Sequence, residues 1–176
     1  MANNKKEGPI NLLITDALCR LINSNKKYND ITIEDIIKEA HICRKSFYRT
    51  FKTKDEILEV KFKDICSKID TYFATNCSHT FSGLVYSIFT VAKDNKDYIL
   101  CFYKANQTLY FGNIVQTLIN SKIFKEEKQN DPTNYYFYIS KVWMVVGILS
   151  SWLNRDCDVA IEDIVRMIKS YQIVRQ

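Results

Sequence analysis

Apolar residues recur at spacings of three and four along most of this 176-residue chain, which is the pattern of amphipathic α-helices. The pattern predicts helices over residues 9–24, 33–40, 44–51, 54–73, 81–93, 96–105, 108–124, 134–154 and 160–174. Only four Gly and two Pro are present, whereas hairpins and sheets depend on such turn residues. The predicted fold class is therefore all-α, with an N-terminal three-helix head followed by a longer helical body.

Residues 31–58 are the most informative stretch. A short amphipathic helix, a three-residue turn (41–43) and a basic helix follow one another. This is the order of a helix-turn-helix, which places its second helix in the DNA major groove. Thr32 and Thr53 each precede an acidic residue by three positions, the capping-box pattern that starts a helix.

The basic helix and the charge of the chain point to the same partner. Phe47 and Phe51 are four apart and face inward, which leaves these side chains to face outward: Arg44, Lys45, Ser46, Tyr48 and Arg49. Up to Lys54, eleven Lys and Arg stand against six Asp and Glu, an excess of +5; beyond it, fourteen stand against fourteen. A localised basic excess is typical of nucleic-acid binding, although charge alone also fits a solvated basic face.

The remaining composition argues against catalysis and against a membrane. Six Cys and two His match no zinc spacing, and the chain lacks a Walker loop, G-x-G-x-x-G and H-E-x-x-H. We therefore expect no enzyme activity, cofactor or metal, and we expect free thiols that lie mostly in the core. The N-terminus lacks a signal peptide, and the longest apolar run, Val142 to Leu149, is too short to span a bilayer. The expected location is the cytoplasm.

The head resembles the TetR family of transcriptional regulators from about Ile10 to Leu58. Three motifs carry the resemblance: T-[ILV]-x-x-I-x-x-x-A beginning at Thr32, F-Y-x-x-F beginning at Phe47, and K-x-[DE]-[ILV]-[ILV] beginning at Lys54. The resemblance implies a DNA-binding domain over 1–53 and a ligand-binding and dimerisation domain over 54–176.

Two residues depart from the family pattern. His41 stands where the family usually has Gly in the turn, and His is among the side chains enriched at positive φ. Cys43 stands where the family often has Ser or Thr as a helix cap. Because it lies at a helix N-terminus beside Arg44 and Lys45, Cys43 is either a candidate oxidant-sensing thiol or only a tolerated cap.

The resemblance also implies which side chains contact double-stranded DNA. It assigns base edges to Arg44, Lys45 and Ser46, and phosphates to Tyr48 and Lys54, with Thr32 and Arg49 as further phosphate candidates. For Tyr48, a half-buried core position is the alternative.

The family binds a small molecule in its body, and this body is rich in aromatic residues. The candidate pocket residues are Tyr86, Phe89, Phe102, Tyr103, Tyr110 and Trp143. Aromatic residues at helical spacing also form ordinary cores, so that alternative stays open.

The family dimerises through its last two long helices. The helix over 134–154 is apolar nearly all round, and the last helix adds a second apolar stripe. The candidate dimerisation residues are Val142, Val146, Leu149, Ile161, Ile164, Val165 and Ile168. An intrachain core is the alternative for the same stripe.

These observations lead to one hypothesis and two rivals. The favoured one is a TetR-type repressor that binds operator DNA as a homodimer and is released by a small-molecule effector. A coactivator adaptor acting with a partner protein is the second, because one C-terminal subgroup of the family contains such proteins. An enzyme is the third, and the missing catalytic motifs argue against it.

Overall fold

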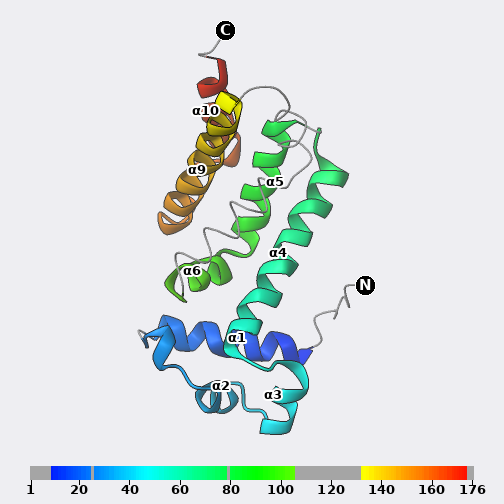
Figure 1. Ribbon diagram of the computed structural model, residues 1–176, viewed down its shortest axis with the longest axis vertical. Helices are drawn as coiled ribbons and strands as arrows, with labels where there is room; N and C mark the ends of the chain where they lie inside the picture. Colours follow the sequence, from blue (N-terminus) through cyan, green and yellow to red (C-terminus); the bar gives the residue numbers. More distant parts are fainter. Residues whose placement is uncertain (1–8, 25, 79, 106–131, 174–176) are drawn as a thin grey trace. The chain divides into compact units, whose positions relative to one another are not determined.

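The computed structural model describes residues 9–24, 26–78, 80–105 and 132–173, and the regular structure among these residues is helical (Figure 1). The elements are α1 (Pro9–Asn23), the 3-10 helix η1 (Tyr28–Asp30), α2 (Ile33–Glu39), α3 (Arg44–Thr50), α4 (Lys54–Asn76), α5 (Phe81–Asp94), α6 (Lys96–Ala105), α9 (Pro132–Asn154) and α10 (Ile161–Ile173). The all-α prediction is confirmed, and nearly every predicted boundary in the described ranges lies within three residues of the observed one. The helix predicted over 108–124 lies outside the described residues.

The chain divides into two compact units. The first comprises Met1–Asp64 and Cys101–Asn106, and the second comprises Ile65–Leu100 and Gln107–Gln176. The helices α4 and α6 each begin in one unit and end in the other.

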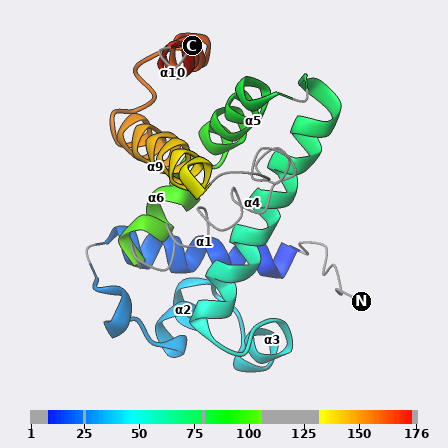
Figure 2. The ribbon, with the colours of Figure 1, turned by 45° about the horizontal axis from the view of Figure 1, so that its top comes forward.

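The first unit is a three-helix head in which α1 packs against α2 and α3 (Figure 2). Its core is made by Ile14, Leu18, Ile36 and Phe47, each fully buried. Not every apolar residue of α1 faces the core, because Leu13 is 48% exposed. Positions 14, 18 and 22 point inward at a spacing of four, which places Leu13 at the outer edge of the helix.

In the second unit, α5 packs against α9 and α10. Phe89 of α5 is fully buried, and its ring lies 5.3 Å from that of Trp152 in α9. The indole N–H of Trp152 donates to the carbonyl of Val159 at 2.9 Å, which ties the end of α9 to the link before α10. By length and composition alone, α9 could cross a membrane between Tyr136 and Asn154, and the core helix of a soluble protein passes the same test.

Three residues other than Gly adopt positive φ in the described part of the chain. His41 has φ 52°, which confirms the expectation drawn from its place in the turn. Asp156 and Cys157 follow α9 with φ 60° and 57°, and the sequence pattern did not predict this turn.

The cysteines are free thiols, as expected, but most of them lie outside the core. Only Cys19 and Cys101 are buried, while Cys43 is exposed and the other three are intermediate. Their placement was wrong because small size permits burial without requiring it.

Candidate nucleic-acid interface

The turn between α2 and α3 is closed by backbone hydrogen bonds. The His41 N–H donates to the carbonyl of Lys38, and the Ile42 N–H donates to that of Ile37, both at 3.2 Å. The positive φ of His41 reverses the chain here, so that Cys43 can begin the next helix as its N-cap. The result is a short, fixed link between the two helices.

The two faces of α3 differ in the way the sequence predicts. Phe47 is fully buried and Phe51 is 2% exposed. Lys45 and Arg49 are exposed, and within the described part of the chain the side chain of neither makes a hydrogen bond or an ion pair. Tyr48 is 46% exposed and meets Phe47 only edge-on, which favours the outward position over a core role.

Thr32 forms the predicted capping box with Asp35. The Asp35 N–H donates to Thr32 Oγ1 at 3.1 Å, and the Thr32 N–H donates to Asp35 Oδ2 at 2.8 Å. The Thr32 hydroxyl also donates to that carboxylate, and Lys26 Nζ lies 2.7 Å from it. These contacts hold the pKa of Asp35 well below its usual range, the bond from Lys26 contributing most. The Thr32 hydroxyl thus has a partner inside the head.

The second predicted cap, at the start of α4, forms in part. The Glu56 N–H donates to Thr53 Oγ1 at 3.1 Å. The Glu56 carboxylate accepts from the Lys52 N–H at 2.6 Å, in place of the expected bond from Thr53 itself.

The ammonium group of Lys54 lies among backbone carbonyls. Its Nζ donates to the carbonyls of Tyr28 at 2.7 Å, Ile31 at 2.9 Å and Asn29 at 3.3 Å. It also lies 4.5 Å from the centre of the Tyr28 ring. All three N–H donors of the ammonium therefore hold the η1 turn, so the phosphate contact expected of Lys54 needs these bonds to break or to be shared.

Tyr28 completes this contact set, and the sequence pattern did not predict its role. Its hydroxyl donates to Asp55 Oδ1 at 2.6 Å. Burial first, and then the bond to Asp55, raise the pKa of the Tyr28 phenol far above its ordinary value. The available signal in the sequence was a single aromatic residue in a polar link.

Cys43 and Ser46 are paired at the start of α3. Cys43 Sγ lies 3.3 Å from Ser46 Oγ. Hydrogen bonds from the Ser46 side chain and backbone lower the pKa of the Cys43 thiol. Ser46, expected to reach a base edge, is thus in contact with the thiol of the N-cap residue.

The structure describes five of the six residues predicted to line a pocket. Phe102 and Tyr103 belong to the first unit, Phe89 is packed in the core of the second, and Trp143 is 51% exposed. The Tyr86 hydroxyl donates to Glu162 Oε1 at 3.2 Å, which joins α5 to α10. Tyr110 lies outside the described residues.

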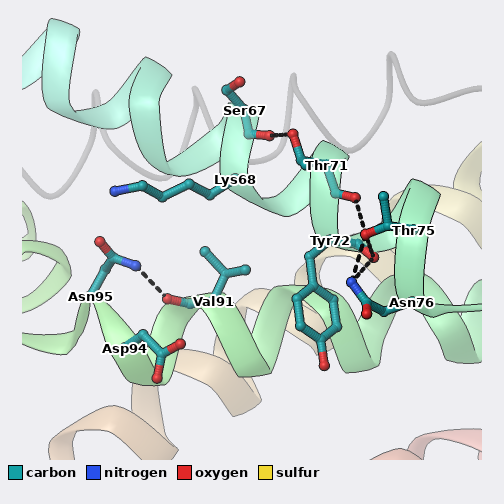
Figure 3. Close-up of a pocket in the computed structure, with 9 residues that line it drawn as sticks. All are labelled: Ser67, Lys68, Thr71, Tyr72, Thr75, Asn76, Val91, Asp94 and Asn95. Atoms are coloured by element: carbon teal, nitrogen blue, oxygen red, sulfur yellow. Dashed lines mark hydrogen bonds between the residues drawn. The ribbon is translucent and has the colours of Figure 1, made fainter. Parts of the chain in front are cut away.

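The second unit has an open groove of about 540 Å³ between α4 and α5 (Figure 3). It is lined by Ser67, Lys68, Thr71, Tyr72, Thr75, Asn76, Val91, Asp94 and Asn95. Many of its polar groups are already bonded to their own helices; for example, Thr71 Oγ1 donates to the carbonyl of Ser67, and Asn95 Nδ2 to that of Val91. No predicted pocket residue lines this groove.

Most of the predicted dimerisation residues are buried within the single chain. Val142, Val146, Leu149, Ile164 and Ile168 are each at most 5% exposed, as the intrachain-core alternative requires. Ile161 and Val165 are intermediate. The periodicity identified a buried face correctly, and α5 of the same chain packs against both helices.

A different face of α9 is exposed. Its residues recur at spacings of four and three and carry no charge: Tyr136, Ser140, Trp143, Gly147 and Ser151. A methyl group built on Gly147 would meet nothing within 4 Å. We call these five residues the α9 stripe.

The N-terminal and the C-terminal parts of the chain each match a known protein family. Residues 14–60 match the family described as "Bacterial regulatory proteins, tetR family", and residues 79–173 match its "Transcriptional regulator C-terminal region". No curated protein matches the chain.

Two solved structures share the fold. One is titled "Dihydroxyacetone kinase operon activator DhaS", with a TM-score of 0.63 and 16% identity, covering 95% of this chain and 96% of that one. The other, the fatty acid degradation regulator FadR from Bacillus halodurans, has a TM-score of 0.59 and 17% identity over 93% and 94%. Both terminal matches and the helical fold agree with the motifs at Thr32, Phe47 and Lys54. The chain therefore belongs to the TetR family of transcriptional regulators.

Proposed function

We propose that the protein is a repressor that binds a pseudopalindromic operator as a homodimer and is released by a small-molecule effector. The two faces of α3 carry this proposal. Buried Phe47 and Phe51 fix the helix on the head, while the opposite face presents two exposed cations, Lys45 and Arg49, that have no partner in the described part of the chain. Such an anchored, cationic helix suits the major groove.

The side chains on the outer face of α3 have two different roles in DNA recognition. Arg44 and Lys45 open the helix, the end that meets base edges, so they supply sequence preference. The Tyr48 hydroxyl and Arg49 bind phosphates, which position the helix without reading sequence. This division makes Arg44→Ala and Tyr48→Phe a matched pair of tests.

Selection of duplexes from a random pool, followed by fluorescence anisotropy, tests the assignment. Arg44→Ala should weaken the selected duplex roughly 5- to 150-fold and a scrambled duplex less. Tyr48→Phe should weaken both duplexes by the same factor. Equal losses on both duplexes for Arg44→Ala would show that Arg44 is only a phosphate contact.

The homodimer is proposed to form through the α9 stripe, in place of the buried residues expected from the sequence. Its small residues allow close approach, and Trp143 supplies a large apolar contact. Trp143→Glu should produce monomers by analytical ultracentrifugation, with the helix content kept. Leu12→Glu, at an exposed apolar residue of α1, is the control and should remain dimeric. A dimer that survives Trp143→Glu places the interface elsewhere.

The effector is proposed to be a hydrophobic or aromatic small molecule bound in the helical body, and the protein to act in the cytoplasm without enzyme activity. A thermal-shift screen followed by operator competition tests the effector. Compounds that stabilise the protein yet leave operator affinity unchanged would refute induction.

Activation with a partner protein is the second candidate. It is favoured by the shared fold with the operon activator DhaS, whose title names that role for DhaS itself. Transcription from a template carrying the selected duplex distinguishes the two, because a repressor lowers transcript yield and an activator raises it.

A further inference from the structure

Arg44, the first residue of α3, is held by side chains on both sides of the turn. Its Nη2 lies 3.2 Å from Oε1 of Glu34, a residue of α2. Its guanidinium carbon lies 5.7 Å from the centre of the Tyr48 ring, one turn further along α3. A long and flexible side chain is thereby oriented at the end of α3 that meets DNA.

The Glu34–Arg44 ion pair is expected to contribute little to folding stability. The two side chains are 55% and 68% exposed, and exposed ion pairs contribute little to stability. A carboxylate on the DNA-facing head is also repelled by phosphates, so Glu34 lowers affinity unless it has another task.

Asp35, the neighbouring acidic residue, has different partners from Glu34. Asp35 is used by the capping box and by Lys26, so its charge is satisfied within α2 and the preceding link. Glu34 reaches across the turn instead, to the one arginine that opens α3.

The chemistry of the guanidinium leaves Arg44 able to read a base while it is paired. It carries five N–H donors in a planar fork; Nη2 lies beside Glu34, and Tyr48 also interacts with the guanidinium. Five donors are more than these two partners need, so others can donate to O6 and N7 of guanine. Because a rotamer-rich side chain loses freedom on binding, fixing it beforehand is expected to favour the specific complex by about 2- to 12-fold.

We propose that Glu34 is a specificity-determining positioning residue, which holds the Arg44 guanidinium against Tyr48 in the orientation that reads a base pair. In a non-specific complex Arg44 turns to a phosphate, and Glu34 is then left unpaired beside the DNA backbone. The pair therefore favours the operator and disfavours other sequences. This inference rests on the proposed operator-binding function.

The chain offers a matched control for the test. Glu39 lies on the same helix and pairs with Arg20 of α1 at 2.5 Å, away from α3. Glu34→Gln and Glu39→Gln therefore remove the same charge from α2, and only the first frees Arg44.

The experiment measures affinity for a duplex selected by the wild-type protein and for a scrambled duplex of the same length. Glu39→Gln should strengthen binding to both and leave their ratio unchanged. Glu34→Gln should lower the ratio about 2- to 12-fold, with the thermal midpoint unchanged. In the Arg44→Ala background, Glu34→Gln should leave the ratio as it is, because the residue that it positions is gone.

Two results would overturn the inference while the proposed function stands. One is a ratio for Glu34→Gln that matches that of Glu39→Gln. The other is an equal fall of the ratio with and without Arg44, which would show that Glu34 reads DNA itself. If the wild-type protein enriches no sequence at all, operator binding is refuted, and the role of Glu34 falls with it.

Discussion

Lys54→Ala separates a structural role of this lysine from the phosphate contact that the family resemblance implies. Its ammonium donates to three carbonyls of the segment from Tyr28 to Ile31, at 2.7, 2.9 and 3.3 Å, and lies over the Tyr28 ring. Removing it leaves the η1 turn without these bonds. We therefore expect the folded head itself to be less stable.

The size of the effect follows from these contacts. A hydrogen bond from a charged group contributes about 1.5–3 kcal/mol, and a cation–π contact at a partly exposed site about 0.5–1 kcal/mol. The contributions are not additive, since water reaches some of the freed carbonyls, so we expect a total loss of about 2–3 kcal/mol. For a chain of this size that lowers the thermal midpoint by about 4–12 °C.

Circular dichroism melting of the DNA-free protein measures this loss. Lys45→Ala is the control, because it removes the same charge from an exposed side chain that has no partner in the described structure. It should weaken DNA binding and leave the melting midpoint unchanged. If Lys54→Ala melts like the wild type but lowers the salt slope of DNA binding by about one, Lys54 is a phosphate contact and the structural reasoning is wrong.

The remaining substitutions test other features. Gly83→Ala should destabilise by about 1–3 kcal/mol in denaturant unfolding, because its Cβ would lie 2.2 Å from a backbone carbonyl; an unchanged free energy of unfolding would show that this carbonyl can move aside. His41→Gly should raise the free energy of unfolding by up to about 1 kcal/mol, as relief of positive φ outweighs the freedom gained by the unfolded chain; a loss would show that the imidazole makes a needed contact. Because the pKa of the Cys43 thiol is lowered, iodoacetamide should react with it at lower pH than with an ordinary thiol. Ser46→Ala should shift the pH dependence of this rate towards higher pH. A pH dependence that does not shift would show that Ser46 does not lower the pKa of the thiol.

The head was predictable because its signals are local. The capping residues Thr32 and Thr53 act within one turn, and the inward pair Phe47 and Phe51 lies on one short helix, so each can be read from neighbouring residues. The positive φ of His41 was expected because this residue stands where the family usually has Gly in the turn. By contrast, the Lys54 contacts join positions more than twenty residues apart, and no periodicity records such a bond.

The body shows where periodicity stops being informative. A pattern of apolar residues says that a face is covered, but it does not say whether the same chain or a second copy covers it. Val142, Val146 and Leu149 were expected at a dimer interface and are instead buried within one chain. The face left open on α9 carries Trp143 and Gly147 among small uncharged residues, a mixture that reads from sequence as weakly amphipathic. A helix that is apolar nearly all round has two faces that could be buried, and the sequence pattern does not say which of them the rest of the chain covers.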